Sequence, residues 1–432
     1  MGKQRLADRR HGVGLKCYFV LLVGLITVAL FFSAPFIAFS INMGSSTTIS
    51  MLSIDSCDGS DTPVLLWNYT TDSRVGTYVI TRGIVYTSPL IAQNTLYFAS
   101  DDGHVYALNA TSGTEIWTTD NGFSQVDDAP KFPTVDNGRI FVGGYHEIYA
   151  LDANSGSQIW ASRVISGRTA TVGAPIVIAN DVLYIGFDYD GLRTLNANTG
   201  DVHWWFTDTC DMLFVSSSPL VDGDVVYVGG SNTVFALNAQ SRSEIWNYSI
   251  GNPANSICPS ISSFALDNGV LYFCAGDGAV YALDVNSGKN IWNTTYTLPG
   301  VPGVYIPSSP ILRNGLIYVG SGTGDVCALN ATDGTKLWDS TLGESMLSAP
   351  ALYGGVLYFG SSDSNLYALN ATSGIELWRY SLPGVGSPIV CEGVLYVGGV
   401  DGVYALRVSP PFPTLEASSA TTMWSTFSIL IT

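Results

Sequence analysis

The chain has 432 residues and a net charge of −17, and only 12% of its residues are charged. Five of its 18 basic residues lie before residue 17, so the remainder is more acidic than the whole. Such a surface excludes nucleic-acid binding, because nothing on it replaces the counterions of a phosphate backbone. A hydrophobic share of 47%, with 46 Gly and 19 Pro, favours an all-β protein with many turns.

The N-terminus joins a basic segment, 1–17, to an uncharged apolar run at 18–39. A helix over that run is long enough to cross a bilayer, and the basic cluster before it predicts a cytoplasmic N-terminus. We expect a single-pass transmembrane signal anchor in the cell membrane, a linker over 40–63 and the rest of the chain outside the cytoplasm. A cleaved signal peptide is the alternative, and both predict export. Cys17 precedes the apolar run, so it is not a lipid-attachment cysteine that follows one.

From residue 64 onward the sequence repeats with a period near 43 residues. Each repeat carries an Ala-Leu or Thr-Leu pair, which begins at Ala107, Ala150, Thr194, Ala236, Ala282, Ala328, Ala368 and Ala405. A tryptophan follows at a fixed distance in all repeats but the last, at Trp117, Trp160, Trp204, Trp246, Trp292, Trp338 and Trp378. The last repeat has Leu415 there instead, and an unmatched Trp67 stands upstream of the first.

Each repeat is interpreted as four short strands separated by turns such as DNG, DDG and TSG. The first strand starts at a small residue followed by Pro, which suits an innermost strand with a free edge. Four-stranded units at this period are typical of a β-propeller. We therefore predict eight blades over 64–408, with each Trp wedged between neighbouring blades.

The unmatched Trp67 indicates how the ring closes. The last repeat supplies only three strands, over 387–408, and the segment around Trp67 has the sequence of a fourth. We predict that this segment completes the last blade and removes the open edges of a linear array. An open β-solenoid is the alternative, but it does not require a complementary half-unit at the other end of the chain.

The motif G-S-x-D-G-x-V-Y-A-L-N-A-x-[ST]-G-x-x-x-W resembles the repeat of the pyrroloquinoline-quinone (PQQ) dehydrogenases and of the propeller lipoprotein of the bacterial outer-membrane assembly machine. The resemblance covers 64–408 and implies an eight-bladed propeller whose tryptophan docking motifs are scaffold. The dehydrogenases carry adjacent cysteines and a Ca²⁺ held by oxygen ligands. No adjacent cysteines occur here, and the best acidic cluster, Asp188 and Asp190, is interpreted as a solvated turn. No cofactor is predicted, and PQQ with Ca²⁺ stays the alternative.

Histidines offer one further candidate metal site. His104 and His146 lie in equivalent turns of successive repeats, where Asp102 or Glu147 could join them around a metal ion. We interpret them as unrelated surface residues, and His203 as a packing residue on an outer strand. No metal site and no catalytic residue are predicted.

The cysteines after Cys17 are isolated in the sequence. Cys210 and Cys258 each follow their repeat's tryptophan in equivalent loops, which makes a disulfide plausible in an exported protein. Cys274 and Cys327 fall within strands and are predicted to be buried free thiols, whereas Cys57 and Cys391 have no predicted partner.

Six N-x-[ST] sequons occur, and they fall into two classes. Those that follow an outer-strand Trp are the predicted glycosylation sites, Asn68, Asn247 and Asn293. The others stand where two repeats have Asp, so their side chains are predicted to cap their own turns, at Asn109, Asn330 and Asn370.

The tail, 409–432, is rich in Pro, Ser and Thr and is interpreted as a spacer. The sequence therefore predicts a membrane-anchored, monomeric propeller that acts as a non-catalytic scaffold for a protein or an envelope polymer. Two alternatives stay open: an exported PQQ-dependent alcohol or sugar dehydrogenase, and an envelope protein assembly factor.

Overall fold

The computed structural model describes two units of the chain, Met1–Ser56 and Cys57–Thr432. In the first it describes four short strands, β1 (Leu21–Leu22), β2 (Leu25–Ile26), β3 (Ser40–Met43) and β4 (Thr47–Ser50). In the second it describes residues 62–71, 74–75, 78–79, 85 and 88–408, without 120–130, 145–146, 165–171, 188–189, 208–216, 231, 252–260, 296–307 and 345–348.

The predicted membrane helix over 18–39 lies outside the described residues, apart from β1 and β2, and stays a prediction. None of the residues that the structure describes belongs to a helix long and apolar enough to cross a membrane. The tail at 409–432 also lies outside the described residues.

The described part of the second unit contains eight four-stranded antiparallel sheets, the blades of a propeller. Blade 1 comprises β8 (Leu90–Ala92), β9 (Thr95–Ala99), β10 (Val105–Asn109) and β11 (Glu115–Thr118). Blade 2 comprises β12 (Lys131–Asp136), β13 (Arg139–Gly143), β14 (Glu147–Asp152) and β15 (Gln158–Arg163). Blade 3 comprises β16 (Val177–Ala179), β17 (Val182–Phe187), β18 (Gly191–Asn196) and β19 (Val202–Phe206). Blade 4 comprises β20 (Leu220–Asp222), β21 (Val225–Gly230), β22 (Thr233–Asn238) and β23 (Glu244–Ser249).

The second half of the ring repeats the pattern. Blade 5 comprises β24 (Ala265–Asp267), β25 (Val270–Cys274), β26 (Ala279–Asp284) and β27 (Asn290–Thr295). Blade 6 comprises β28 (Ile311–Arg313), β29 (Leu316–Gly320), β30 (Asp325–Asn330) and β31 (Lys336–Thr341). Blade 7 comprises β32 (Ala351–Tyr353), β33 (Val356–Gly360), β34 (Asn365–Asn370) and β35 (Glu376–Ser381). Blade 8 comprises β36 (Ile389–Cys391), β37 (Val394–Gly399), β38 (Gly402–Arg407) and β5 (Val64–Thr70), and a separate pair is β6 (Arg74–Val75) with β7 (Tyr78–Val79).

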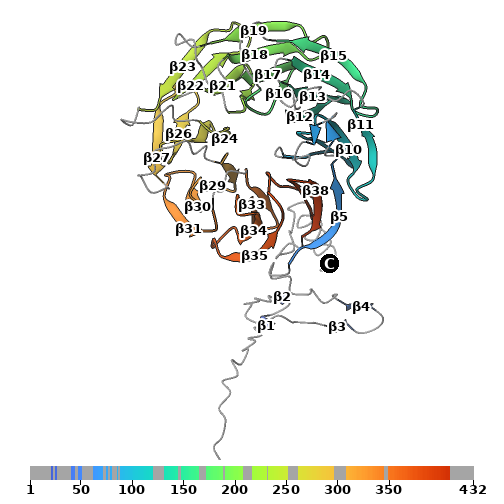
Figure 1. Cartoon of the computed structure of the whole chain (residues 1–432). Helices are drawn as coiled ribbons and strands as arrows, with labels where there is room; N and C mark the ends of the chain where they lie inside the picture. Colours follow the sequence, from blue (N-terminus) through green and yellow to red (C-terminus); the bar gives the residue numbers. More distant parts are fainter. Residues whose placement is uncertain are drawn as a thin grey trace, which may run out of the picture. The chain divides into compact units, whose positions relative to one another are not determined.

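The core lies between the blades. Figure 1 shows the blades as a ring, with first strands such as β16 and β24 inside and fourth strands such as β19 and β27 outside. Each face of a blade packs on a neighbour, so the second and third strands are buried almost throughout. Phe141 and Ile148 of blade 2, for example, share a cluster with Leu183 and Ile185 of blade 3. This sandwiching explains why these strands are apolar rather than alternating.

The predicted ring closure is confirmed. Strand β5 pairs antiparallel with β38, with Trp67 opposite Ala405, as the outermost strand of blade 8. In Figure 1, β5 in blue lies beside β38 in red, although the two are separated by most of the chain. The first and last parts of the propeller therefore share one sheet, which an open solenoid does not have.

Candidate functional site

The repeat tryptophans join each blade to the next. Six of them donate an indole N–H to a backbone carbonyl that follows the third strand of the next blade, at donor–acceptor distances of 2.8–3.2 Å. These pairs are Trp67–Ala110, Trp117–Ala153, Trp160–Ala197, Trp246–Val285, Trp292–Ala331 and Trp338–Ala371. A buried indole needs such a partner, so the tryptophans are scaffold residues.

A glycine three residues after each of these acceptors explains the TSG part of the motif. It adopts a left-handed φ of 65–77°, a region that glycine enters without a Cβ penalty. A Cβ built on it would also lie 2.4–2.7 Å from an atom of the docked indole. The six positions are Gly113, Gly156, Gly200, Gly288, Gly334 and Gly374. Both the backbone conformation and the ring contact therefore require glycine.

Two tryptophans depart from this pattern. Trp204 is buried, but among the described residues its indole makes no bond like the other six. In the turn that it faces, Arg242 stands at the glycine position with a φ of 64°. Trp378 is also buried, and the turn that would follow the third strand of blade 8 falls in 409–432, outside the described residues.

Tyrosines of the second strand reinforce the same joints, which the sequence analysis missed. Tyr396 donates its hydroxyl to Ala110, the carbonyl that Trp67 also uses, at 3.1 Å. In the same way Tyr97 donates to the Ala153 carbonyl, which Trp117 uses, and Tyr272 donates to the Ala331 carbonyl, which Trp292 uses. The signal is the Tyr that recurs in the second strand of seven repeats, in segments such as LYF and VYV, with Phe141 in its place in the second repeat.

The turn aspartates of the DDG and DSN type bind tyrosines of the third strand. The pairs are Asp102–Tyr106, Asp277–Tyr281, Asp363–Tyr367 and Asp401–Tyr404. Burial and the hydrogen bond to its aspartate raise the pKa of Tyr281, and the same two causes raise the pKa of Tyr367 to about 12. These aspartates therefore act as acceptors that fix the turns.

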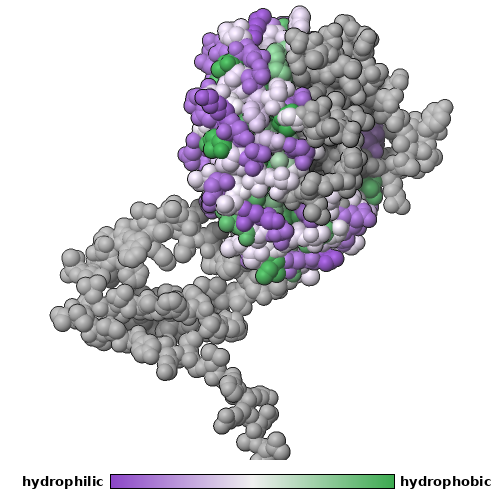
Figure 2. All heavy atoms as spheres, turned by 90° about the vertical axis from the view of Figure 1, so that its left-hand side faces the viewer, coloured by the Kyte–Doolittle hydropathy of each residue, from purple (hydrophilic) through white to green (hydrophobic). Residues whose placement is uncertain are grey.

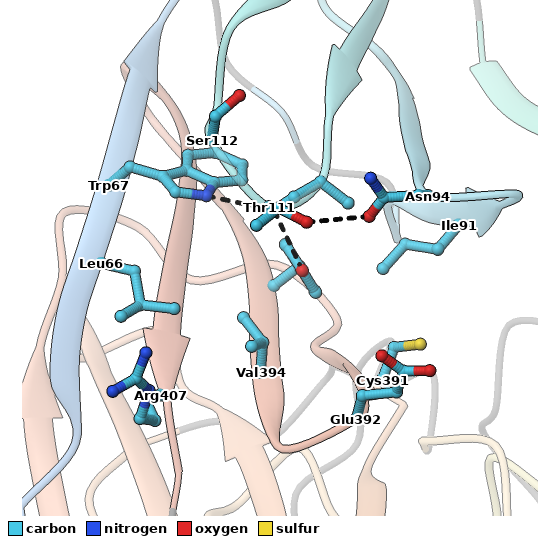
Figure 3. Close-up of a pocket in the computed structure, with 12 residues that line it drawn as sticks. Leu66, Trp67, Ile91, Asn94, Thr111, Ser112, Cys391, Glu392, Val394 and Arg407 are labelled. Carbon is cyan, nitrogen blue, oxygen red and sulfur yellow. Dashed lines mark hydrogen bonds between the residues drawn. The ribbon is translucent and has the colours of Figure 1, made fainter.

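A hollow of about 550 Å³ lies at the seam where blade 8 meets blade 1 (Figure 3). Its walls combine apolar and polar side chains, namely Leu66, Trp67, Ile91, Asn94, Ala110, Thr111, Ser112, Cys391, Glu392, Val394, Tyr396 and Arg407. In Figure 3, Trp67 and Arg407 come from the two strands of blade 8 on one side, and Glu392 comes from the β36–β37 hairpin. Ligand sites are lined predominantly by apolar side chains with a few polar groups, so this mixed lining does not by itself indicate a ligand.

Its origin lies in the way the ring is closed. In the other blades, an Asn or Asp at the end of the third strand begins the turn to the fourth, as Asn109 does by accepting the backbone N–H groups of Thr111 and Ser112. In blade 8 that position is Arg407, and its fourth strand β5 comes from the opposite end of the chain. No direct turn can therefore cover this end of blade 8.

The candidate metal residues are engaged in turns. Asp102 accepts the backbone N–H of His104 at 3.0 Å and the Tyr106 hydroxyl at 2.7 Å. Glu147 accepts the hydroxyl of Tyr149, and His146 lies outside the described residues. Within the described ranges, no group of three or more His, Cys, Asp or Glu is arranged to hold a metal ion.

Asp190 and His203 both lie in blade 3. Asp190 pairs with the Arg193 guanidinium at 2.6 Å, while Asp188 lies outside the described residues. The prediction that His203 packs is wrong, because it is exposed and the neighbouring Trp204 fills the buried position.

Two cysteines meet in the core between blades 5 and 6. Cys274 and Cys327 are buried free thiols in one cluster, and burial raises the pKa of Cys327. Cys391 is a free, exposed cysteine at the seam. The predicted Cys210–Cys258 disulfide lies outside the described residues, as does Cys57.

The two classes of sequon occupy different surroundings. Asn68, Asn247 and Asn293 are exposed on outer strands, and their glycosylation stays a prediction. The side-chain oxygens of Asn109, Asn330 and Asn370 accept backbone N–H groups of their own turns.

The repeat region of the chain matches a known protein family. The family model described as outer membrane protein assembly factor BamB matches residues 59–132, 101–302 and 276–409. The chain belongs to this family. BamB of Yersinia pestis is 26% identical over 238 residues, which are 55% of this chain and 48% of that protein. The match thus spans about half the length of that relative.

Two solved structures have the same fold. BamB from Moraxella catarrhalis superimposes with a TM-score of 0.63 and 19% identity, over 80% of this chain and 97% of that one. Quinohemoprotein alcohol dehydrogenase from Comamonas testosteroni gives a TM-score of 0.64 and 17% identity, over 85% and 79%. A BamB-type propeller and a redox enzyme thus share this architecture, so the fold alone does not assign an activity.

Proposed function

We propose that this BamB-family propeller is a non-catalytic scaffold that binds a protein partner outside the cytoplasm, tethered to the cell membrane by the segment 18–39. The partner is an envelope protein, and binding serves its assembly. The family's description as an assembly factor supports the envelope role.

The observation that carries this proposal is a row of exposed aliphatic side chains on the outer strands. The residue before the docking Trp is apolar and about half exposed in five blades, at Ile116, Ile159, Ile245, Ile291 and Leu337. Figure 2 looks onto the rim that carries β23, β27 and β31, where green apolar groups are scattered among purple polar ones.

Each outer strand is also the edge of its sheet, with backbone groups free to pair. An extended segment of a partner can add to such an edge through main-chain hydrogen bonds, and exposed aliphatic side chains then supply apolar contacts. The repeat tryptophans and turn aspartates are already used within the scaffold, and the large apolar side chains that stay exposed lie on the outer strands, apart from Ile375.

The test combines capture with a redox assay. The chain, carrying a photo-crosslinker on β27, is incubated with a detergent extract of envelope proteins from its own source. We expect a discrete crosslinked envelope protein, lost when Ile245, Ile291 and Leu337 are all changed to Asp. The control Ile375→Asp, at a residue that is more exposed but lies between β34 and β35 rather than on an outer strand, should keep it. Reduction of a dye by the chain with PQQ, Ca²⁺ and an alcohol or aldose would contradict the proposal.

A further inference from the structure

The outer strand of blade 3 departs from those of the next four blades. In blades 4 to 7, the residues two before and one after the docking Trp are joined by a polar contact of 2.6–3.2 Å. The pairs are Glu244–Asn247, Asn290–Asn293, Lys336–Asp339 and Glu376–Arg379. In β19 these positions are Val202 and Trp205, whose exposed fractions are 40% and 63%. Blade 3 therefore presents an indole to solvent where blades 4 to 7 present bonded polar groups.

Trp205 stands on a fixed support. It lies opposite Arg193 in the ladder between β18 and β19, with the guanidinium carbon 5.9 Å from the ring centroid. Two nitrogens of Arg193 bind Asp190, Nε at 2.7 Å and Nη2 at 2.6 Å. Both nitrogens bind the same oxygen, Oδ2 of Asp190, which restricts the guanidinium, and the cation attracts the face of the indole.

Blade 7 contains the same cross-strand pair with its partners exchanged. There Tyr367 occupies the position of Arg193, and Arg379 occupies that of Trp205, 5.2 Å from the tyrosine ring. In that arrangement the aromatic ring is fully buried and the cation lies outside. The fold can therefore form this cation–π pair with the aromatic ring buried and the arginine outside. Packing of the scaffold does not explain why the indole of blade 3 is exposed.

The surroundings of Trp205 indicate which ligand it suits. Trp205 lies on the rim beside an ion pair, and its blade lacks the exposed aliphatic residue of the proposed protein-binding row, because His203 stands before the docking Trp204. The flat face of a pyranose ring, with its C–H groups, packs on an indole and leaves its hydroxyls at the ring edge. Of the five N–H donors of Arg193, two point to Asp190, and the side chain is 17% exposed, so part of the remaining three can reach such hydroxyls. The net charge of −17 disfavours a polyanion.

We propose that Trp205, with Arg193 and Asp190, binds a neutral polysaccharide on the rim of blade 3. The open rim suits a chain that lies across it rather than a small molecule held in a cavity. This site goes beyond the proposed function and does not depend on it, because it uses a different blade and different side chains from the row that is tested by protein capture.

The test is affinity electrophoresis of the chain in native gels that contain laminarin, hydroxyethyl cellulose or, as a polyanion, alginate. We expect one of the two neutral polymers to retard the wild type, Trp205→Ala to weaken the association about tenfold or more, and Trp205→Phe to lose less. Ile375→Ala, a control at an equally exposed apolar residue, should migrate like the wild type.

Arg193→Lys tests the supporting cation, because it keeps the charge but removes the planar fork. Arg193→Lys should reduce the retardation of the chain by the neutral polymer. It should lower the midpoint of thermal unfolding less than a substitution in the core does. Equal retardation of the wild type and Trp205→Ala, retardation by alginate alone, or no retardation by either neutral polymer would overturn the proposal. Competition for Trp205 by the crosslinked envelope protein would assign this surface to a protein instead.

Discussion

The indole of Trp67 donates to the carbonyl of Ala110 across the seam of the ring, at 3.1 Å. Gly113 packs under the same indole, where an added Cβ would lie 2.6 Å from a ring atom. Tyr69 of β5 also donates its hydroxyl to Glu115 of blade 1. The closing strand is thus bound to blade 8 by its ladder and to blade 1 by its side chains.

Gly113→Ala should destabilise the fold by about 2–4 kcal/mol, because it adds left-handed strain and a clash with Trp67. The matched control is Gly138→Ala, whose φ of 74° is similar to the 71° of Gly113 but which has no atom within 4 Å of the new Cβ. Denaturant unfolding gives both free energies. Equal losses for the two variants would show that the indole contact contributes nothing.

Replacing a docking Trp by Phe should cost more where the indole is hydrogen-bonded. Trp117→Phe leaves the Ala153 carbonyl without this donor, whereas Trp204→Phe breaks no such bond in the described part of the chain. We expect Trp117→Phe to be the more destabilising by about 1 kcal/mol. Thermal and denaturant unfolding measure this difference, and the opposite order would contradict it.

Arg242→Gly should restore the docking turn that Trp204 lacks. Arg242 has a φ of 64°, and the control Ser364→Gly relieves the same φ of 64° in a turn between the second and third strands of blade 7. Both changes remove backbone strain, but only Arg242→Gly lets an indole pack on the turn. We expect Arg242→Gly to be more stabilising than Ser364→Gly by about 1 kcal/mol. The shift in the denaturant midpoint, with an unchanged dependence of the unfolding free energy on denaturant, measures this difference.

Alkaline pH should weaken the fold through its buried tyrosines. The pKa of Tyr367 is raised to about 12 by burial and by its bond to Asp363, whereas an unfolded tyrosine titrates near about 10. Above that lower value the unfolded chain loses a proton that the folded chain keeps, so stability falls as pH rises from about 10 to about 12. Tyr367→Phe should flatten this fall in unfolding experiments run as a pH series. An unchanged slope would exclude Tyr367 as a cause.

The fold was predictable because its information is periodic. Each docking Trp recurs at a fixed distance from its Ala-Leu or Thr-Leu pair. Trp67 has no such pair before it, and the last repeat lacks its Trp, so the closing strand could also be assigned. The Arg242 substitution is also visible in the sequence, at the glycine position of the fourth TSG-type turn.

The candidate sites were less predictable, because they depend on how the ring closes and on positions where the repeat is interrupted. Tyr396 and Ala110 are separated by 286 positions, and only the closed ring brings them together. The seam hollow depends on the missing turn after Arg407, a feature visible only as the absence of a repeat element. Trp205 follows Trp204 directly, and sequence alone does not tell which of two adjacent indoles is buried.

Because β5 precedes blade 1 in the chain but pairs with β38 at the end of blade 8, the ring has an order of completion. During synthesis or export, β5 emerges first and must wait for more than three hundred residues before its ladder partner arrives. Until then the backbone edge of β5, and the side chains of Leu66 and Trp67 that pack between blades 8 and 1 in the closed ring, are open to wrong partners. A chaperone that held this strand, or a membrane tether close to it, would protect the nascent chain during the whole of that interval.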